Sequence, residues 1–289
     1  MTFKTFNVNG NAFPVRKFDM KKLREGTLPS IVMIAKRGSG KSIVCKNIIA
    51  EFTDFPGGAI ISPSDEANPF YAKFFPNLYI HHEFTHEKME RIWTRQKLIK
   101  KKKEKYEREK NKTIDSRAFL LMDDCLADKG KWVKDDFILK VFFNGRHYDL
   151  MYILTMQFPL GISPDLRNNF DFVFLLADDF FTNQKRLYEH YAGMFPNFSS
   201  FKDVFTDLTQ DHGCMVICNK GARSNILDKI FWYKADINVE IKTFGHKQFN
   251  YINDKNFDIN YDEKDLGLND LDNLMKKKNH KTVKVDKLD

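Results

Sequence analysis

Short apolar runs alternate with longer amphipathic stretches through most of the chain. This alternation is typical of βαβ units around a mainly parallel sheet, so the sequence predicts an α/β fold. The predicted strands are residues 31–34, 59–62, 78–81, 118–122, 151–155, 172–176, 215–217 and 230–233. The predicted helices are residues 42–52, 86–110, 136–144 and 182–208.

The first strand leads into a glycine-rich loop that the next helix follows. Its sequence is Ala35-Lys36-Arg37-Gly38-Ser39-Gly40-Lys41-Ser42, with Ile43 next in the helix. Backbone N–H groups of such a turn surround phosphate oxygens at a helix N-terminus. Lys41 is expected on the β- and γ-phosphates and Ser42 on Mg²⁺. We therefore predict that residues 36–43 bind a nucleotide, with Ala35 replacing the usual first glycine.

A buried strand, 118–122, ends in Asp123 and Asp124. Paired carboxylates at the carboxyl edge of a sheet suit a nucleotide hydrolase: Asp123 would hold magnesium, and Asp124 would orient or deprotonate the attacking water. The alternative is that the pair only caps the next turn. Gln157 ends the following strand, where its amide is expected to sense the γ-phosphate or the water.

Two arginines are candidates for a contact between subunits, Arg146 and Arg167. A guanidinium brought to the γ-phosphate by a neighbouring subunit stabilises transition-state charge. The alternative is a local salt bridge, for which Asp149, Asp165 and Asp171 are candidate partners.

The positive charge is concentrated in one predicted helix. Residues 87–112 contain 12 Lys or Arg and 5 acidic residues, a local charge of +7, against +8 for the whole chain. Lys/Arg side chains bind DNA phosphates without reading sequence, so residues 97–112 are a candidate DNA contact. A solvated helix face, or a contact with a capsid, is the alternative.

The remaining composition limits the class of protein. No run of about 18 apolar residues exists, so we expect an intracellular protein without a membrane span. The four cysteines fall in predicted buried elements and are expected to be free thiols. We divide the chain into an N-terminal extension (1–27), a P-loop ATPase domain (28–243) and a charged, mobile tail (244–289), which is either solvated or in contact with DNA or a partner.

Taken in order, these motifs resemble those of the genome-packaging ATPases of nucleocytoplasmic large DNA viruses and virophages, in the FtsK/HerA superfamily. The supporting stretches are 31–42, 60–64, 121–124, 144–147, 155–157 and 166–171. The resemblance implies an FtsK/HerA-like or RecA-like core that uses ATP and Mg²⁺. It also implies the roles given above for Lys41, Ser42, Asp123, Asp124 and Gln157, with an arginine supplied between subunits.

The same resemblance implies partners and a place of action. We expect a homo-oligomeric ring that moves double-stranded DNA into a preformed capsid, in contact with capsid protein at a packaging vertex. Assembly sites in the host-cell cytoplasm, with association with the virion, would be its location. The alternatives are a P-loop kinase or other enzyme of nucleotide metabolism, and a non-catalytic ATP-binding scaffold.

Overall fold

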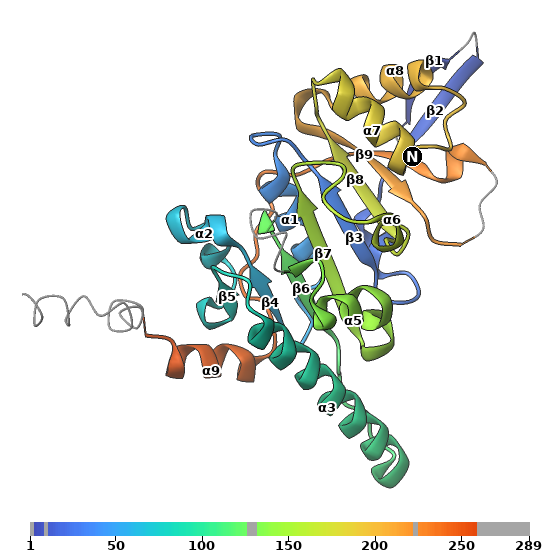
Figure 1. Cartoon of the computed structure of the whole chain (residues 1–289). Helices are drawn as coiled ribbons and strands as arrows, with labels where there is room; N and C mark the ends of the chain where they lie inside the picture. Colours follow the sequence, from blue (N-terminus) through green and yellow to red (C-terminus); the bar gives the residue numbers. More distant parts are fainter. Residues whose placement is uncertain (1–2, 9–10, 126–131, 222–224, 259–289) are drawn as a thin grey trace, which may run out of the picture.

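A computed structural model describes residues 3–8, 11–125, 132–221 and 225–258. Within them the strands form one sheet in the order β1-β2-β10-β9-β8-β3-β7-β6-β4-β5 (Figure 1). The strands are β1 (Phe3–Val8), β2 (Asn11–Lys17), β3 (Ser30–Ile34), β4 (Gly57–Ile61), β5 (Ile80–His81), β6 (Ala118–Met122), β7 (Leu150–Met156), β8 (Phe172–Leu176), β9 (Gly213–Cys218) and β10 (Ile230–Lys234).

The six strands from β8 to β5 are parallel to one another. This confirms the predicted α/β fold with a mainly parallel sheet. Strand β7 follows β6 in the chain but lies between β3 and β6. The carboxyl ends of β3, β7 and β6 are therefore side by side, and the residues that follow these strands share one edge of the sheet.

Helices cover both faces of the sheet, and successive residues of each strand pack alternately against the helices on one face and on the other. In β7, Tyr152 and Leu154 join one apolar cluster, with residues of α3, α5, α7 and α8. Met151 and Ile153 join the other, with residues of α1. The helices are α1 (Lys41–Ala50), α2 (Pro63–Ala67), α3 (His86–Lys110), α5 (Asp136–Asn144), α6 (Pro164–Arg167), α7 (Phe181–Tyr191), α8 (Phe198–Leu208) and α9 (Lys247–Asn256).

The predicted single helix over 182–208 is wrong. The structure has two helices, α7 and α8, separated by a turn that contains Gly193 and Pro196. Proline has no N–H to donate and disfavours helical backbone in the residue before it, so a continuous helix cannot pass this point.

The segments assigned to the two ends of the chain pack on the central domain. Strand β2 pairs with β10, and Phe18 and Leu23 are buried. At the other end Phe244 is buried, and Phe249 of α9 stacks on Tyr79 with ring centroids 3.9 Å apart. Packing thus begins before residue 28 and continues past residue 243; the predicted tail from residue 259 onward lies outside the described residues.

Helix α3 coincides with the predicted segment 86–110, and its second half projects from the body (Figure 1). Met89 and Trp93 are buried beneath its first half. None of the helices in the described ranges combines the length and apolar character needed to cross a membrane. All four cysteines are buried and keep their thiols outside any disulfide, as predicted.

Candidate nucleotide site

The glycine-rich loop connects β3 to α1, as predicted. Gly38 and Gly40 have φ angles of 80° and 97°, in the left-handed region that favours glycine. Helix α1 begins at Lys41, and the first N–H groups of a helix have no partner within it. The loop therefore offers backbone donors and the positive end of a helix to an anion.

Lys41 connects the loop to the paired carboxylates. Its Nζ lies 3.0 Å from Oδ1 of Asp123 and 3.9 Å from Oδ1 of Asp124. Burial lowers the pKa of Lys41, but the two carboxylates raise it more, so the pKa is above its usual value. The amine therefore remains charged where a phosphate would bind.

Two side chains that the sequence analysis did not single out hold Asp123 in place. The Thr155 hydroxyl donates to Oδ1 of Asp123 (2.6 Å), and the Tyr71 hydroxyl donates to Oδ2 (2.9 Å). Both residues are buried, as is Asp123 itself. Thr155 lies on the predicted strand that ends at Gln157, next to the strand that ends at Asp123. Its position two residues before Gln157 was therefore the only signal in the sequence. Tyr71 gave none, because it begins a short 3-10 turn, Tyr71–Lys73, between α2 and β5.

Asp124 and Gln157 are in direct contact. The Gln157 amide Nε2 lies 2.6 Å and 2.7 Å from the two carboxylate oxygens of Asp124. Asp124 also has a φ of 56°, and its N–H donates to the Thr155 hydroxyl. A non-glycine residue in the left-handed region stores strain, which is found most often at functional sites. Thr155 thus fixes both members of the acidic pair.

The donor set around this cluster fits a magnesium-nucleotide complex. Mg²⁺ prefers oxygen ligands and usually keeps several waters beside one or two carboxylates and substrate phosphates. Ser42, in the first turn of α1, and Asp123, at the end of β6, would supply the protein oxygens. Of the remaining residues predicted to bind the nucleotide, Arg37 is exposed in the loop, and Ile43 lies in the first turn of α1, where its N–H donates to the Gly40 carbonyl.

Lys36 points away from this cluster. Its Nζ forms an ion pair with Asp179 at 2.7 Å and lies 5.0 Å from the centre of the Phe180 ring. Asp179 and Phe180 follow β8, the neighbour of β3 on the side opposite to β7. Phe180 is 60% exposed.

A strained turn also touches the loop on this side. Asp211 and His212 have φ angles of 49° and 60°, just before β9. A Cβ added to Gly40 would lie 3.6 Å from the His212 side chain, so the imidazole lies alongside the loop. Gly213 admits no side chain, since a Cβ there would lie 2.2 Å from the Leu208 carbonyl oxygen. This turn was not predicted, because its only signal in the sequence is Asp-His-Gly.

The two candidate arginines lie elsewhere and differ from each other. Arg146 is exposed just before β7, at the sheet edge opposite to the glycine-rich loop, and makes no ion pair with any described residue. It lines a 480 Å³ cavity that Asp171 also lines. Arg167 is 9% exposed and donates to the Ile162 carbonyl within its own subunit. Neither joins the cluster around Lys41 in a single chain.

Comparison with known proteins identifies the family. A family model described as the poxvirus A32 protein matches residues 15–190. The chain belongs to this family. Among relatives, protein L437 of Acanthamoeba polyphaga mimivirus is 44% identical over 254 residues, 88% of each chain. Protein 015R of Frog virus 3 is 32% identical over 76% of this chain and 66% of its own.

A solved structure supports the same fold. The genome-packaging NTPase B204 of Sulfolobus turreted icosahedral virus 2, in complex with AMPPCP, superposes with a TM-score of 0.52. The match covers 72% of this A32-family chain and 98% of B204 at 16% identity. Together the family and the fold confirm the resemblance to viral packaging ATPases that the motifs indicated, and the P-loop NTPase fold.

Proposed function

We propose that this A32-family protein is an ATP-hydrolysing motor that moves double-stranded DNA into a preformed capsid. The observation that carries the proposal is the contact of Lys41, Asp123, Asp124 and Gln157 at one glycine-rich loop. A binding scaffold needs the lysine and the loop but gains nothing from a second carboxylate held by an amide. Membership of the A32 family, together with the B204 fold, favours packaging over nucleotide metabolism.

The residues divide the chemistry between them. Lys41 binds the β- and γ-phosphates, and Asp124 accepts a proton from the attacking water. A bound Mg²⁺, held by Ser42 and Asp123, would neutralise developing phosphate charge. Gln157 now donates to Asp124, so its amide must turn toward the γ-phosphate or share Asp124 with the water before hydrolysis. That exchange is how Gln157 reports the state of the nucleotide.

The position of Arg146 supports action in a ring. It is exposed at the sheet edge opposite to its own Lys41, so it reaches a nucleotide only on another subunit. Arg167 would first have to leave the Ile162 carbonyl and the Tyr191 ring, 6.0 Å away. We therefore assign the arginine supplied between subunits to Arg146 rather than Arg167.

The nucleoside end of ATP lies on the other side of the loop. Asp123, Asp124 and Gln157 mark the γ-phosphate side, because they follow β6 and β7. The base and ribose then extend toward the end of β8 and the start of β9, where Phe180 and His212 lie beside the loop. An exposed aromatic ring and an imidazole are suited to stacking on a purine base.

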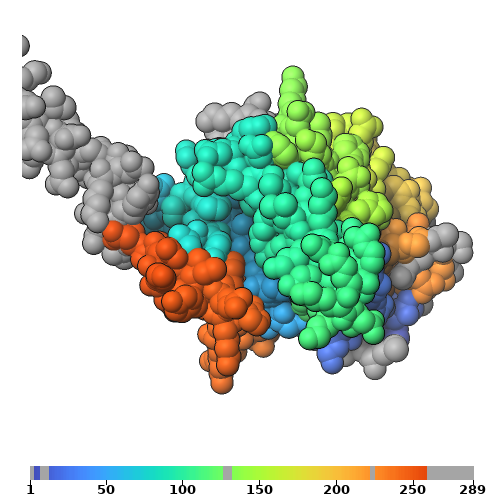
Figure 2. All heavy atoms as spheres, turned by 90° about the horizontal axis from the view of Figure 1, so that it is seen from below, coloured from blue at the N-terminus to red at the C-terminus, as the bar shows by residue number. Residues whose placement is uncertain are grey.

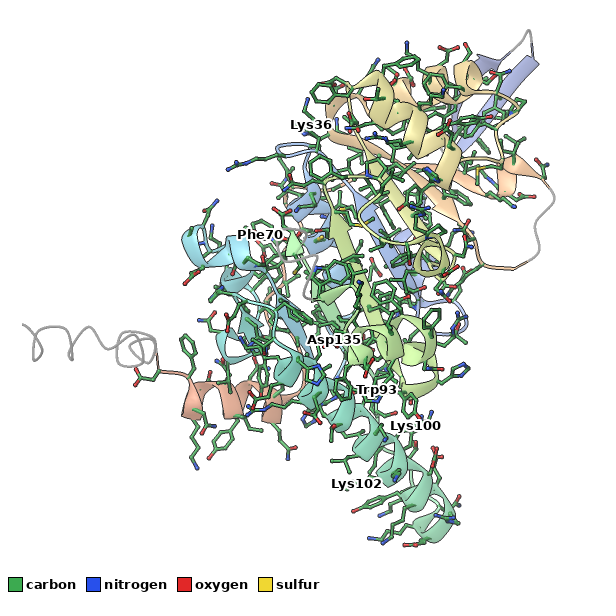
Figure 3. The ribbon with its side chains drawn as sticks, viewed as in Figure 1. Lys36, Phe70, Trp93, Lys100, Lys102 and Asp135 are labelled. Carbon is green, nitrogen blue, oxygen red and sulfur yellow. The ribbon has the colours of Figure 1, made fainter. Side chains whose placement is uncertain are left out.

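The projecting end of α3 is the proposed DNA contact. Lys100 and Lys103 lie 3.2 Å and 3.5 Å from Asp149, whereas Lys101 and Lys102 are exposed. Figure 3 shows Lys100 and Lys102 on this end, far from Lys36 at the nucleotide loop. Changing Lys101 and Lys102 to Glu should weaken DNA binding and flatten its salt dependence. The same change at Lys185 and Arg186 of α7 is the control, and an unchanged slope places the contact elsewhere.

Hydrolysis measured with and without long double-stranded DNA tests the function as a whole, alongside mass by light scattering. If the protein is a packaging motor, we expect an oligomer whose ATP turnover rises with DNA and disappears in Lys41→Ala. A monomer with DNA-independent turnover would instead indicate an enzyme of nucleotide metabolism. The motor would act at viral assembly sites in the host cytoplasm, at a capsid vertex, and remain associated with the virion.

A further inference from the structure

A groove of about 760 Å³ lies between α3 and α9, away from the nucleotide site. Figure 2 shows it as the recess between α9, in orange, and α3, in green, with the earlier strands in blue behind it. Its apolar surface includes Ile92 and Ile99 of α3, Phe249 and Ile252 of α9, and Phe119 of β6. Ile252 is 45% exposed, so this apolar surface is open to an occupant.

One wall of the groove is positively charged. Lys88, Arg91 and Arg95 follow one another on the side of α3 that lines it. His81 also lines the groove, but burial, with help from Lys88 and His82, lowers its pKa to about 4, so it is neutral at pH 7. Asp115 also lines the groove, but it is paired with Arg117 at 2.7 Å, so the positive charge of this wall comes from the lysine and the two arginines.

Arg95 is the cation that lacks an acidic partner. Lys88 pairs with Glu83 at 3.2 Å and Arg91 with Glu87 at 2.5 Å. Arg95 donates to the amide oxygen of Gln96, and no carboxylate among the described residues lies within ion-pair distance of it. Its surroundings desolvate the guanidinium and lower its pKa. Because a partly desolvated charge beside apolar surface is unfavourable without a partner, Arg95 is suited to binding an anion.

The chain itself contains a segment with the complementary chemistry. Residues 261–275 contain five acidic residues and one lysine, a net charge of −4. They also contain four leucines and a methionine: Leu266, Leu268, Leu271, Leu274 and Met275. From residue 258, where the described structure ends, eight residues reach Leu266, about 26 Å when extended. Helix α9 has 10 residues, or about 15 Å, so the segment is long enough to return along it.

We infer that the groove between α3 and α9 binds the acidic, leucine-rich segment 261–275 of this chain. The leucines occupy the apolar surface of Ile92, Phe249 and Ile252, and a carboxylate of the segment pairs with Arg95. The basic residues that follow, from Lys276, are thereby held on the side of the molecule that carries the basic end of α3.

Photo-crosslinking in the full-length protein tests this. With p-benzoylphenylalanine in place of Leu268, irradiation should give crosslinks to residues 88–99 and 246–252, and the same probe in place of Val283 should not. Arg95→Glu should reduce the Leu268 crosslink several-fold, as should high salt. Arg108→Glu, on the same helix beyond the groove, should leave it unchanged, and the circular dichroism spectra should match. Crosslinks elsewhere, or insensitivity to Arg95→Glu, would overturn the assignment.

Discussion

Gln157 donates to both carboxylate oxygens of Asp124, at 2.6 Å and 2.7 Å. The residue proposed to activate water is therefore held by the residue proposed to sense the nucleotide. Release of Asp124 by Gln157 would couple the γ-phosphate to proton transfer, which explains why an amide lies beside a base in this site.

Asp124→Asn should separate binding from hydrolysis. Asparagine also tolerates the left-handed backbone found at this position, so the fold should survive. Loss of the base should lower kcat by about 10²–10⁴-fold while nucleotide binding persists. Single-turnover hydrolysis and fluorescent-nucleotide titration measure the two effects. Asp179→Asn, at an acid outside the cluster, is the control, and hydrolysis retained in Asp124→Asn would remove the residue from the mechanism.

Thr155 should matter through its hydroxyl alone. Thr155→Val keeps the shape but removes one of the hydrogen bonds that Asp123 accepts and leaves the Asp124 N–H without its partner. An unsatisfied buried group costs about 1–3 kcal/mol, and Asp123 is held less firmly, so both stability and magnesium-dependent nucleotide affinity should fall. Thr155→Ser restores the hydroxyl and should recover both in urea denaturation and binding assays. If valine and serine behave alike, the hydrogen bonds do not organise the pair.

The proposed nucleoside contacts can be tested with a ligand that lacks a nucleoside. Phe180→Ala and His212→Ala should weaken ADP binding several-fold and leave inorganic tripolyphosphate binding unchanged. Lys41→Ala should weaken both ligands, because phosphate binding is common to them. Phe181→Ala, at the equally exposed neighbour, is the control. Equal losses for ADP and tripolyphosphate would place Phe180 and His212 outside a base subsite.

Mixed oligomers test whether Arg146 acts between subunits. Arg146→Ala and Lys41→Ala should each be inactive alone. In a mixture, some interfaces combine the intact Lys41 of one variant with the intact Arg146 of the other, so part of the activity should return. An Arg167→Ala and Lys41→Ala mixture provides the comparison. Absence of recovery with Arg146→Ala would place that residue in a structural role.

The sequence predicted the layered elements because their patterns are local. Buried strands such as 118–122 and 172–176, and the helices 86–110 and 136–144, agree with the structure residue for residue. The elements at the two ends of the chain were harder to predict, because β2 and α9 are stabilised by residues distant in the sequence. Phe18 packs on Phe172 and Phe174, and Phe249 packs beside Gly57, and neither contact leaves a pattern within its own segment.

The site was predictable where a motif is contiguous. The glycine-rich loop and Asp123-Asp124 can each be recognised from a few consecutive residues. The order of the strands in the sheet then brings Gln157 next to Asp124. Tyr71, Phe180 and His212 were not predictable, because each reaches the site from a different short connection between the main strands and helices. Only the sheet order, with β8 and β9 on one side of the loop, brings the last two together.

The most direct test of the central claim is displacement of a third strand from a long DNA duplex. A motor that tracks along double-stranded DNA removes a bound triplex-forming strand as it passes, and the released strand is measured by fluorescence. We predict release of the third strand that requires ATP, is lost in Lys41→Ala, and is lost in Asp124→Asn although nucleotide still binds. ATP hydrolysis that DNA stimulates without any release of the third strand would contradict translocation.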